Sequence, residues 1–255
     1  MNGAGGPYDA DAADEARPPL VAVGAGEVVD ALRSGAVVAV PNVGGYCLAV
    51  RAGSANDEAK LVELAADPDG PHYAVGQIED LRSLTSGWTD ELGRLLERCW
   101  PGPVEVFVPW SGTDRPALAE DDEVPLDPDA DHAGASGAAG AAGGAGAGYG
   151  AWAAVVGMPD GRALRRLCRE QGPWRTVPLT FTEPDEVAHA FGASDVAVVV
   201  DGGRREGPPP TLVDATVTPI RVLREGALPA SFIEGTMLMS TRRRLFSRNK
   251  KPDAG

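Results

Sequence analysis

Segments with a helical spacing of apolar residues alternate along the chain with short, continuously apolar runs. The first pattern is typical of amphipathic helices and the second of buried strands. The pattern predicts five helices, over residues 26–35, 54–66, 89–100, 160–172 and 182–192. It predicts seven strands, over residues 36–40, 103–110, 151–159, 176–181, 195–203, 211–216 and 219–227. This mixture indicates an α/β fold in which helices flank a twisted mixed sheet.

Three of the predicted helices begin with residues that commonly cap a helix N-terminus. Ser54 is the predicted N-cap of the second helix, and Asp57 follows three residues later. Asp160 is the predicted N-cap of the fourth helix. Thr182 and Asp185 have the spacing of a capping box at the start of the fifth helix.

One segment, residues 111–150, interrupts the alternation. It is first rich in acidic residues and proline and then consists almost entirely of alanine and glycine, a composition that favours a mobile insert. Neither flank has enough elements to close a core alone, so we predict one domain over residues 21–235. A disordered acidic N-terminus, residues 1–20, and a basic tail, residues 236–255, are predicted on either side.

The charge of the chain is strongly negative and unevenly distributed. Its 255 residues carry a formal net charge of −14, which disfavours contact of the body with nucleic acid or anionic membranes. The last fifteen residues carry six basic side chains and one aspartate, a net charge of +5. Weak RNA contact through this tail is therefore an alternative. The only long uncharged stretch is too glycine-rich for a membrane helix, so no membrane span is predicted.

Cysteine and histidine usage argues against disulfides and metals. Cys47, Cys99 and Cys168 are an odd, scattered set without Cys-x-x-Cys spacing, and the three histidines are isolated from one another. We therefore predict no disulfide framework and no metal site. The N-terminal residues lack the apolar run of a secretory signal, and a reducing cytoplasm fits the cysteines.

A glycine-bearing turn follows the first predicted strand. Residues 37–50 read Val-Val-Ala-Val-Pro-Asn-Val-Gly-Gly-Tyr-Cys-Leu-Ala-Val, and no carboxylate or cation occurs there before Arg51. Gly44 and Gly45 either let the backbone approach a ligand closely or supply a positive φ angle to an ordinary turn. The sequence leaves both interpretations open.

Two further motifs stand between the predicted elements. Trp-Pro-Gly-Pro occupies residues 100–103, and Leu-Arg-Glu-Gly-Ala occupies residues 223–227. With the order of the elements, they make residues 25–230 resemble the YrdC/YciO family. Its best-known members make threonylcarbamoyl-AMP from threonine, bicarbonate and ATP for tRNA modification. The resemblance implies a YrdC-like domain and, if the family activity is retained, the use of ATP with Mg.

The family pattern after the first strand, Pro-Thr-Asp-Thr-x-Tyr-Gly-Leu, is only partly retained. The chain keeps Pro41, Tyr46 and Leu48. It carries Asn42, Val43 and Gly44 in place of the polar triplet, and Cys47 in place of the glycine. The residues that shape the turn are thus kept, whereas those that contact substrate in the family are not.

This chain has no cationic side chain at the positions where the resemblance implies one. The Lys-x-Arg pair aligns with residues 65–67, a later arginine aligns with Gly157, and a threonine aligns with Glu105. Phosphoryl and carboxyl transfer need cations or oriented donors. Each charge-assisted hydrogen bond is worth about 1.5–3 kcal/mol, so losing three costs on the order of 5–9 kcal/mol. Arg175 is the candidate replacement cation, and Lys60 is predicted to face elsewhere.

The residues predicted to contact a nucleotide or threonine are Tyr46, Thr180, Thr211, Asp214 and Arg224. The Ser-Ala-Asn stretch that helps to hold the phosphates in the family aligns with residues 178–180. No catalytic residue is predicted, because the resemblance transfers none.

The sequence favours a non-catalytic or strongly divergent relative of the threonylcarbamoyl-AMP synthases, a pseudoenzyme that binds a small ligand or a protein partner. One alternative is an active L-threonylcarbamoyladenylate synthase that acts in tRNA t6A modification with a variant site. A second alternative is an RNA-associated accessory protein that acts through the basic tail. The resemblance also implies double-stranded RNA binding by a positive surface, which the acidic body disfavours.

Overall fold

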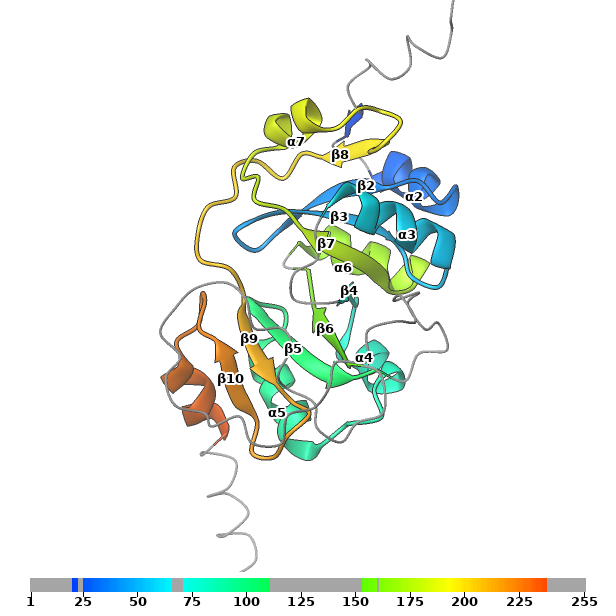
Figure 1. Cartoon of the computed structure of the whole chain (residues 1–255). Coiled ribbons are helices and arrows are strands. Elements are labelled where there is room, and N and C mark those ends of the chain that lie inside the picture. The colour runs from blue at the N-terminus through cyan, green and yellow to red at the C-terminus, as the bar shows by residue number, and fades with distance from the viewer. Residues whose placement is uncertain (1–19, 23–24, 66–70, 111–152, 160, 238–255) are drawn as a thin grey trace, which may run out of the picture.

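Ten strands form one mixed sheet in a computed structural model of the chain, which describes residues 20–22, 25–65, 71–110, 153–159 and 161–237. The strand order is β1-β8-β2-β3-β7-β4-β6-β5-β9-β10 (Figure 1). The strands are β1 (Leu20–Ala22), β2 (Val38–Asn42), β3 (Gly45–Arg51), β4 (His72–Ala74), β5 (Val104–Pro109), β6 (Ala153–Gly157), β7 (Trp174–Pro178), β8 (Val198–Val200), β9 (Thr211–Asp214) and β10 (Arg221–Arg224).

Both parallel and antiparallel pairs occur in this sheet. The pairs β1–β8, β2–β8, β4–β6 and β5–β9 are parallel, and the other five neighbouring pairs are antiparallel. The predicted α/β fold with a mixed sheet is therefore confirmed. The predictions for the acidic N-terminus, for residues 111–150 and for most of the basic tail fall outside the described residues.

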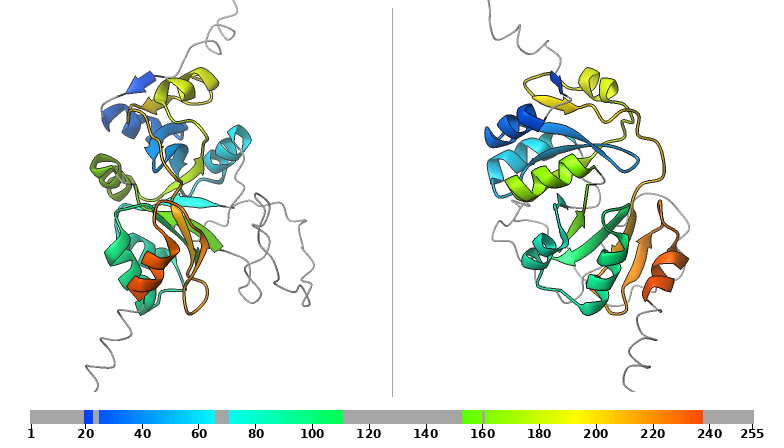
Figure 2. Two further views of the ribbon diagram at one scale, coloured as in Figure 1. Left: turned by 90° about the vertical axis from the view of Figure 1, so that its left-hand side faces the viewer. Right: turned by 180° about the vertical axis from the view of Figure 1, so that it is seen from behind.

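Helices pack on both faces of the sheet. They are α2 (Ala25–Arg33), α3 (Ala55–Leu64), α4 (Ile78–Leu84), α5 (Asp90–Cys99), α6 (Arg162–Gln171) and α7 (Pro184–Ala190). A further helix covers residues 230–237. Helices α2 and α6 lie on one side of β2 and β3 and α3 lies on the other, as Figure 2 shows. Helix α5 packs over β4, β5, β6 and β9 in a third cluster of buried side chains.

Side-chain alternation along β3 explains how one strand serves two of these clusters. Cys47 and Ala49 pack with α2 and α6, whereas Tyr46, Leu48 and Val50 pack with α3 and α7. Successive residues of a strand point to opposite faces, and a strand buried on both faces needs a continuous apolar run. The sequence from Tyr46 to Val50 is such a run.

Helix starts agree with the sequence in one case and differ in two. Ser54 caps α3, and its side chain accepts a hydrogen bond from the Asp57 N–H, as predicted. The predicted capping box at Thr182 was wrong by one residue, because Glu183 is the N-cap of α7 and its backbone N–H donates to the Glu186 carboxylate at 3.1 Å. Helix α6 is capped by Gly161 without a side-chain hydrogen bond, so the prediction of Asp160 as the N-cap was also wrong.

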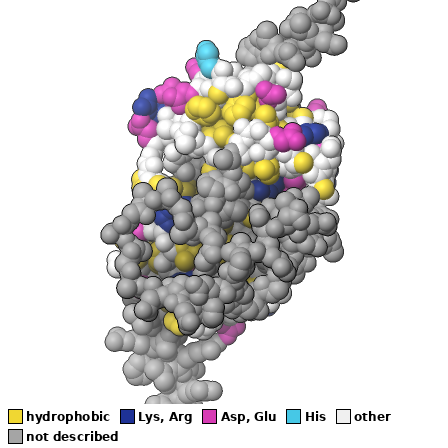
Figure 3. Space-filling view, viewed as in Figure 1, with side chains coloured by type: hydrophobic (Ala, Val, Ile, Leu, Met, Phe, Trp, Pro, Cys, Tyr) yellow, Lys and Arg dark blue, Asp and Glu magenta, His cyan; other side chains and the backbone are white. Residues whose placement is uncertain are grey.

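On the described part of the face that is visible in Figure 3, acidic and basic side chains are interspersed. Acidic and basic side chains surround a hydrophobic patch over α7 and β8 on the part of this face that the described residues form. In the same described residues, no helix is long and apolar enough to cross a bilayer. All three cysteines are buried and free.

Candidate functional site

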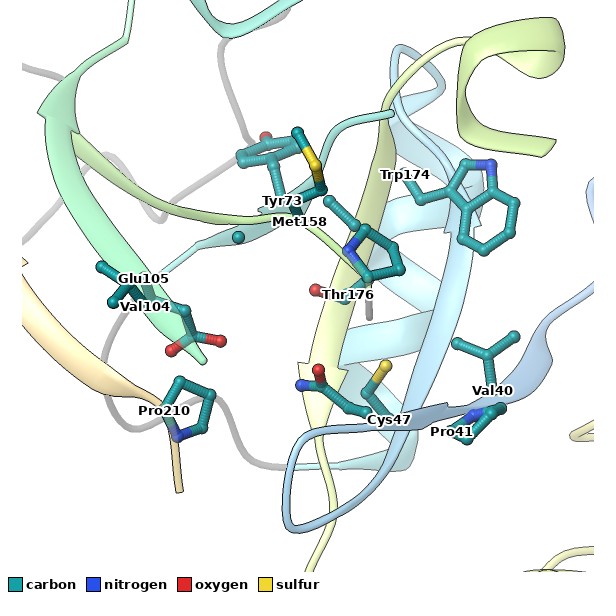
Figure 4. Close-up of a pocket in the computed structure, with 14 residues that line it drawn as sticks. Val40, Pro41, Cys47, Tyr73, Val104, Glu105, Met158, Trp174, Thr176 and Pro210 are labelled. Carbon is teal, nitrogen blue, oxygen red and sulfur yellow. The ribbon is translucent and has the colours of Figure 1, made fainter. Parts of the chain in front are cut away.

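A cleft lies across the middle of the sheet, on the face that also carries α2 and α6. Its volume is about 30 Å³. Fourteen residues line it: Val40, Pro41, Asn42, Cys47, Tyr73, Ala74, Val104, Glu105, Gly157, Met158, Pro159, Trp174, Thr176 and Pro210 (Figure 4). The cleft is narrow, so as it stands it has room for a small group.

Strand register brings the cleft residues together from distant parts of the sequence. On β7, Thr176 lies opposite His72 of β4, and on β6, Gly157 lies opposite Ala74. Because alternate residues share a face, these strands present Thr176 and Gly157 to the same side as Cys47 of β3. Glu105 enters from β5, and its carboxylate and the Thr176 hydroxyl point into the same space in Figure 4.

Glu105 is the one charged side chain among the described residues that line the cleft. It is 8% exposed, and its Oε2 lies 4.0 Å from a terminal nitrogen of Arg224. Burial and, to a smaller extent, the nearby charge of Glu105 together raise the pKa of the Cys47 thiol to about 12. Glu105 therefore places a negative charge at the wall of the cleft, and Arg224 offsets part of it.

Tyr46 lies under the loop that follows β8. It is buried, and its hydroxyl donates to the Gly203 carbonyl at 2.9 Å and accepts from the Gly202 N–H at 3.1 Å. Burial raises the pKa of this phenol. The hydroxyl thus holds the Asp201-Gly202-Gly203 turn, and Tyr46 is not among the residues that line the cleft.

Thr180 lies in the segment that follows β7, next to Tyr46 along the sheet. The Leu179 N–H donates to the Tyr46 carbonyl at 2.9 Å, and the Tyr46 N–H donates to the Phe181 carbonyl at 3.1 Å. The side chain of Thr180 itself is exposed, and it does not line the cleft.

Thr211 and Asp214 begin and end β9, and both side chains are fully buried. The Thr211 hydroxyl is bonded to the backbone of residues 226–228. The Asp214 carboxylate accepts from the backbone N–H of Thr216 at 2.9 Å and from Arg221 at 3.0 Å. Their polar atoms therefore hold neighbouring parts of the chain.

Of the five residues predicted to bind a ligand, Arg224 lies nearest to the cleft, through its ion pair with Glu105. None of the five is among the residues that line it. Sequence reasoning missed Trp174, Thr176 and Met158 as cleft residues, because each occupies an ordinary position in a strand or at its end. Their proximity is set by strand register, which a single sequence does not reveal.

The glycine turn between β2 and β3 is filled by the chain itself. A Cβ atom added to Gly44 would lie 3.0 Å from the Gly207 carbonyl oxygen and 3.1 Å from that of Pro208. One added to Gly45 would lie 2.9 Å from the Phe181 carbonyl oxygen. Gly44 also has a φ of 77°, which favours glycine. Close backbone packing thus accounts for both glycines.

The candidate replacement cation, Arg175, faces away from the cleft. It lies between Trp174 and Thr176 on β7, and both of those line the cleft. Its guanidinium donates to the His72 carbonyl at 3.2 Å and lies 3.9 Å from a carboxylate oxygen of Glu58. Lys60 also lies elsewhere, as predicted, since its ammonium contacts the Gly35 carbonyl at 3.1 Å.

Fold and cleft together define a YrdC-like α/β domain. Residues 30–121 match the model of the Sua5/YciO/YrdC family, which is described as telomere recombination. The predicted resemblance to this family is therefore confirmed over residues 30–121, and the fold agrees with it. No curated protein matches the chain in sequence.

Solved structures share the fold at low sequence identity. Sua5 of P. abyssi, complexed with L-threonine, aligns with a TM-score of 0.63 and 22% identity, over 82% of this chain and 56% of that one. E. coli YciO aligns with a TM-score of 0.61 and 18% identity, over 80% and 89%. MTH1692 of Methanobacterium thermoautotrophicum aligns with a TM-score of 0.52 and 22% identity, over 84% and 90%. The chain thus spans little more than half the length of the Sua5 structure.

Proposed function

We propose that this chain is a non-catalytic or strongly divergent relative of the threonylcarbamoyl-AMP synthases, and that its cleft binds a small ligand other than ATP. The observation that carries this proposal is the charge of the cleft. Glu105 is the one charged side chain among its described lining residues. A triphosphate placed there would face a carboxylate.

The charge of the cleft lining distinguishes a nucleotide site from a site for another kind of ligand. Nucleotide-using sites stabilise phosphate charge with Lys, Arg, Mg²⁺ or oriented backbone donors. A buried carboxylate acts in the opposite direction, because like charges repel more strongly where water is excluded. Arg224 offsets part of this charge from 4.0 Å away. One arginine paired to a glutamate supplies little net attraction for an anion.

The internal bonding of the retained family residues supports the same proposal. The hydroxyls of Tyr46 and Thr211 and the carboxylate of Asp214 each hydrogen-bond within the domain. Selection for a stable fold is sufficient to retain such residues after the original reaction is lost. A protein partner is the other ligand that this proposal allows, and the cytoplasm stays the predicted compartment.

The alternative proposal is an active L-threonylcarbamoyladenylate synthase that uses ATP with Mg. Tyr46, Thr180, Thr211, Asp214 and Arg224 would then be its substrate contacts. The observation that favours it is the fold match to a Sua5 structure that contains L-threonine. An RNA-associated role through the basic tail stays a prediction from sequence, because residues 238–255 lie outside the described part of the chain.

Calorimetric titration with ATP–Mg, in the presence of threonine and bicarbonate, tests the proposal. We expect no binding below millimolar concentrations and no release of pyrophosphate. A family member that makes threonylcarbamoyl-AMP, assayed under the same conditions, is the positive control for the assay. Micromolar binding together with pyrophosphate release would overturn the proposal and favour the synthase.

A further inference from the structure

We infer that the cleft binds its ligand through a protonated amine, which takes its place beside the Glu105 carboxylate. This inference rests on the proposed function and names the ligand class of the same cleft. The ligand is a small monocation, such as a primary alkylammonium, and not an anion. Three observations carry it: the position of Glu105, the reach of its charge, and the size and polarity of the space.

The Glu105 side chain lies in the space that an arginine side chain at position 157 would need. A Cβ atom built on Gly157 would lie 3.2 Å from Glu105 Cγ and 3.6 Å from Glu105 Oε1. Any side chain at position 157 would thus meet the glutamate. Gly157 adds no charge to the cleft wall, and Glu105 adds a negative charge at a point where both residues face the cleft.

The charge of Glu105 extends across the cleft to β3. Cys47 lies on the far wall, and the glutamate adds to the rise in the pKa of its thiol. A negative charge that disfavours a thiolate at that position favours a cation in the space between the two side chains. A neutral or anionic head group would gain nothing from this field.

The space matches a small head group with several donors. The cleft volume of about 30 Å³ accommodates a group of about the size of a water molecule, and an ammonium group is close to water in size. An ammonium carries three N–H donors. The lining offers it oxygen acceptors on Glu105, Thr176 and Asn42. Apolar side chains such as Pro41, and Met158 opposite, can contact an attached alkyl chain.

Arg224 shares the Glu105 carboxylate with the ligand and limits the charge that the ligand can carry. A carboxylate can accept about four hydrogen bonds, so Glu105 can contact Arg224 and a ligand donor together. The Arg224 side chain is 39% exposed and lies on the outer side of the pair. Its positive charge disfavours a second cationic group on the same ligand. A divalent metal is also disfavoured, because the described residues hold no cluster of three His, Cys, Asp or Glu ligands.

Titration with butylammonium chloride, followed by protein-observed NMR at pH 7, tests the inference. We expect millimolar binding that shifts the backbone signals of Cys47 and Thr176. Sodium butyrate and butanol, which have the same chain length, should give no such shifts. Equal binding of the three probes, or butylammonium shifts confined to other residues, would overturn the inference.

Glu105→Gln supplies the matched variant, since it keeps the size of the side chain and removes the charge. Its butylammonium affinity should fall about tenfold or more. Glu97→Gln changes the net charge equally on the exposed side of α5 and should leave the affinity unchanged. If Glu105→Gln does not fold, the site-specific shifts in the unmodified protein still decide. If butylammonium does not bind in the cleft and calorimetry also detects no ATP binding, this inference is wrong but the proposed function is not contradicted.

Discussion

The Thr211 hydroxyl is bonded at once to both backbone groups of Leu228. It donates to the Leu228 carbonyl at 2.6 Å and accepts from the Leu228 N–H at 3.0 Å. It also accepts from the Gly226 N–H at 3.0 Å, and the residue is fully buried. One donor and two acceptor positions are all that a hydroxyl has. The first residue of β9 therefore fastens the segment after β10 to the sheet.

Replacing Thr211 with Val should destabilise the domain by at least about 3 kcal/mol. Valine keeps the shape of threonine but leaves two backbone N–H groups and one carbonyl without their partner, and each such buried group costs about 1–3 kcal/mol. Urea unfolding of the two proteins measures the difference. Thr180→Val, at an exposed position, is the control and should change the stability by less than about 0.5 kcal/mol. Equal effects of both substitutions would contradict a structural role for Thr211.

Replacing Tyr46 with Phe should cost about 1–2 kcal/mol at neutral pH, because the Gly203 carbonyl and the Gly202 N–H lose their partner. The cost should shrink at high pH. The folded pKa of this phenol is raised above its unfolded value near 10. Its contribution is thus complete below pH 10 and is lost as the pH rises further. Thermal unfolding at pH 7 and pH 11 tests this, and a cost that does not change with pH would contradict it.

The fold was largely predictable because local signals agreed along most of the chain. The capping of α3 by Ser54 and the strand that contains Val104–Pro109 are examples. Strand β3 was not predicted as a separate element, because its apolar run continues that of β2 across a two-residue turn. Strand β4 has three residues, too few for a periodic signal.

The cleft was less predictable than the fold. Glu105 stood out as a substitution, but its position over Gly157 depends on the pairing of β5 with β6 across the 111–152 interval. The orientation of Arg175 depends in the same way on the register of β7. A one-residue shift would have turned its guanidinium into the cleft. Such long-range register is fixed by packing and is not encoded in any local pattern.

The stability of the protein should fall steeply between pH 9 and pH 12. Burial raises the pKa of Cys47 from 9.0 to about 12, with Glu105 adding to the rise, and also raises the pKa of Cys168. The folded state therefore holds these protons more tightly than the unfolded chain, and stability is lost as the pH rises. One such thiol contributes a slope of about 1.4 kcal/mol per pH unit.

Comparison with Cys47→Ala isolates the share of that thiol. The variant should be less stable at pH 7, because a small cavity replaces the sulfur. Its stability should nevertheless fall less steeply than that of the unmodified protein between pH 9 and pH 12. Urea unfolding at four or so pH values in this range measures both slopes. Equal slopes for the two proteins would show that the Cys47 thiol has the same pKa in the folded and unfolded states.

The last prediction concerns the pair formed by Glu105 and Gly157. Gly157→Arg alone should destabilise the domain by about 1–3 kcal/mol, since its Cβ would come within 3.2 Å of Glu105 Cγ. Adding Glu105→Thr should recover most of this loss. The double variant should bind ATP–Mg about tenfold or more tightly than the unmodified protein, because it exchanges a carboxylate for a guanidinium at the cleft.

Gly157→Ala separates the two causes in this double-variant test, because it adds the Cβ without the charge. It should share part of the destabilisation and gain no ATP affinity. Unfolding and calorimetric titration of four variants, Gly157→Arg, Gly157→Ala, Glu105→Thr and the double variant, complete the comparison. Additive destabilisation in the double variant would mean that Glu105 does not take the space of the arginine. Recovered stability without any gain in ATP affinity would mean that something other than the charge of the cleft excludes the nucleotide, and the narrow space between β5 and β3 would then be the remaining cause.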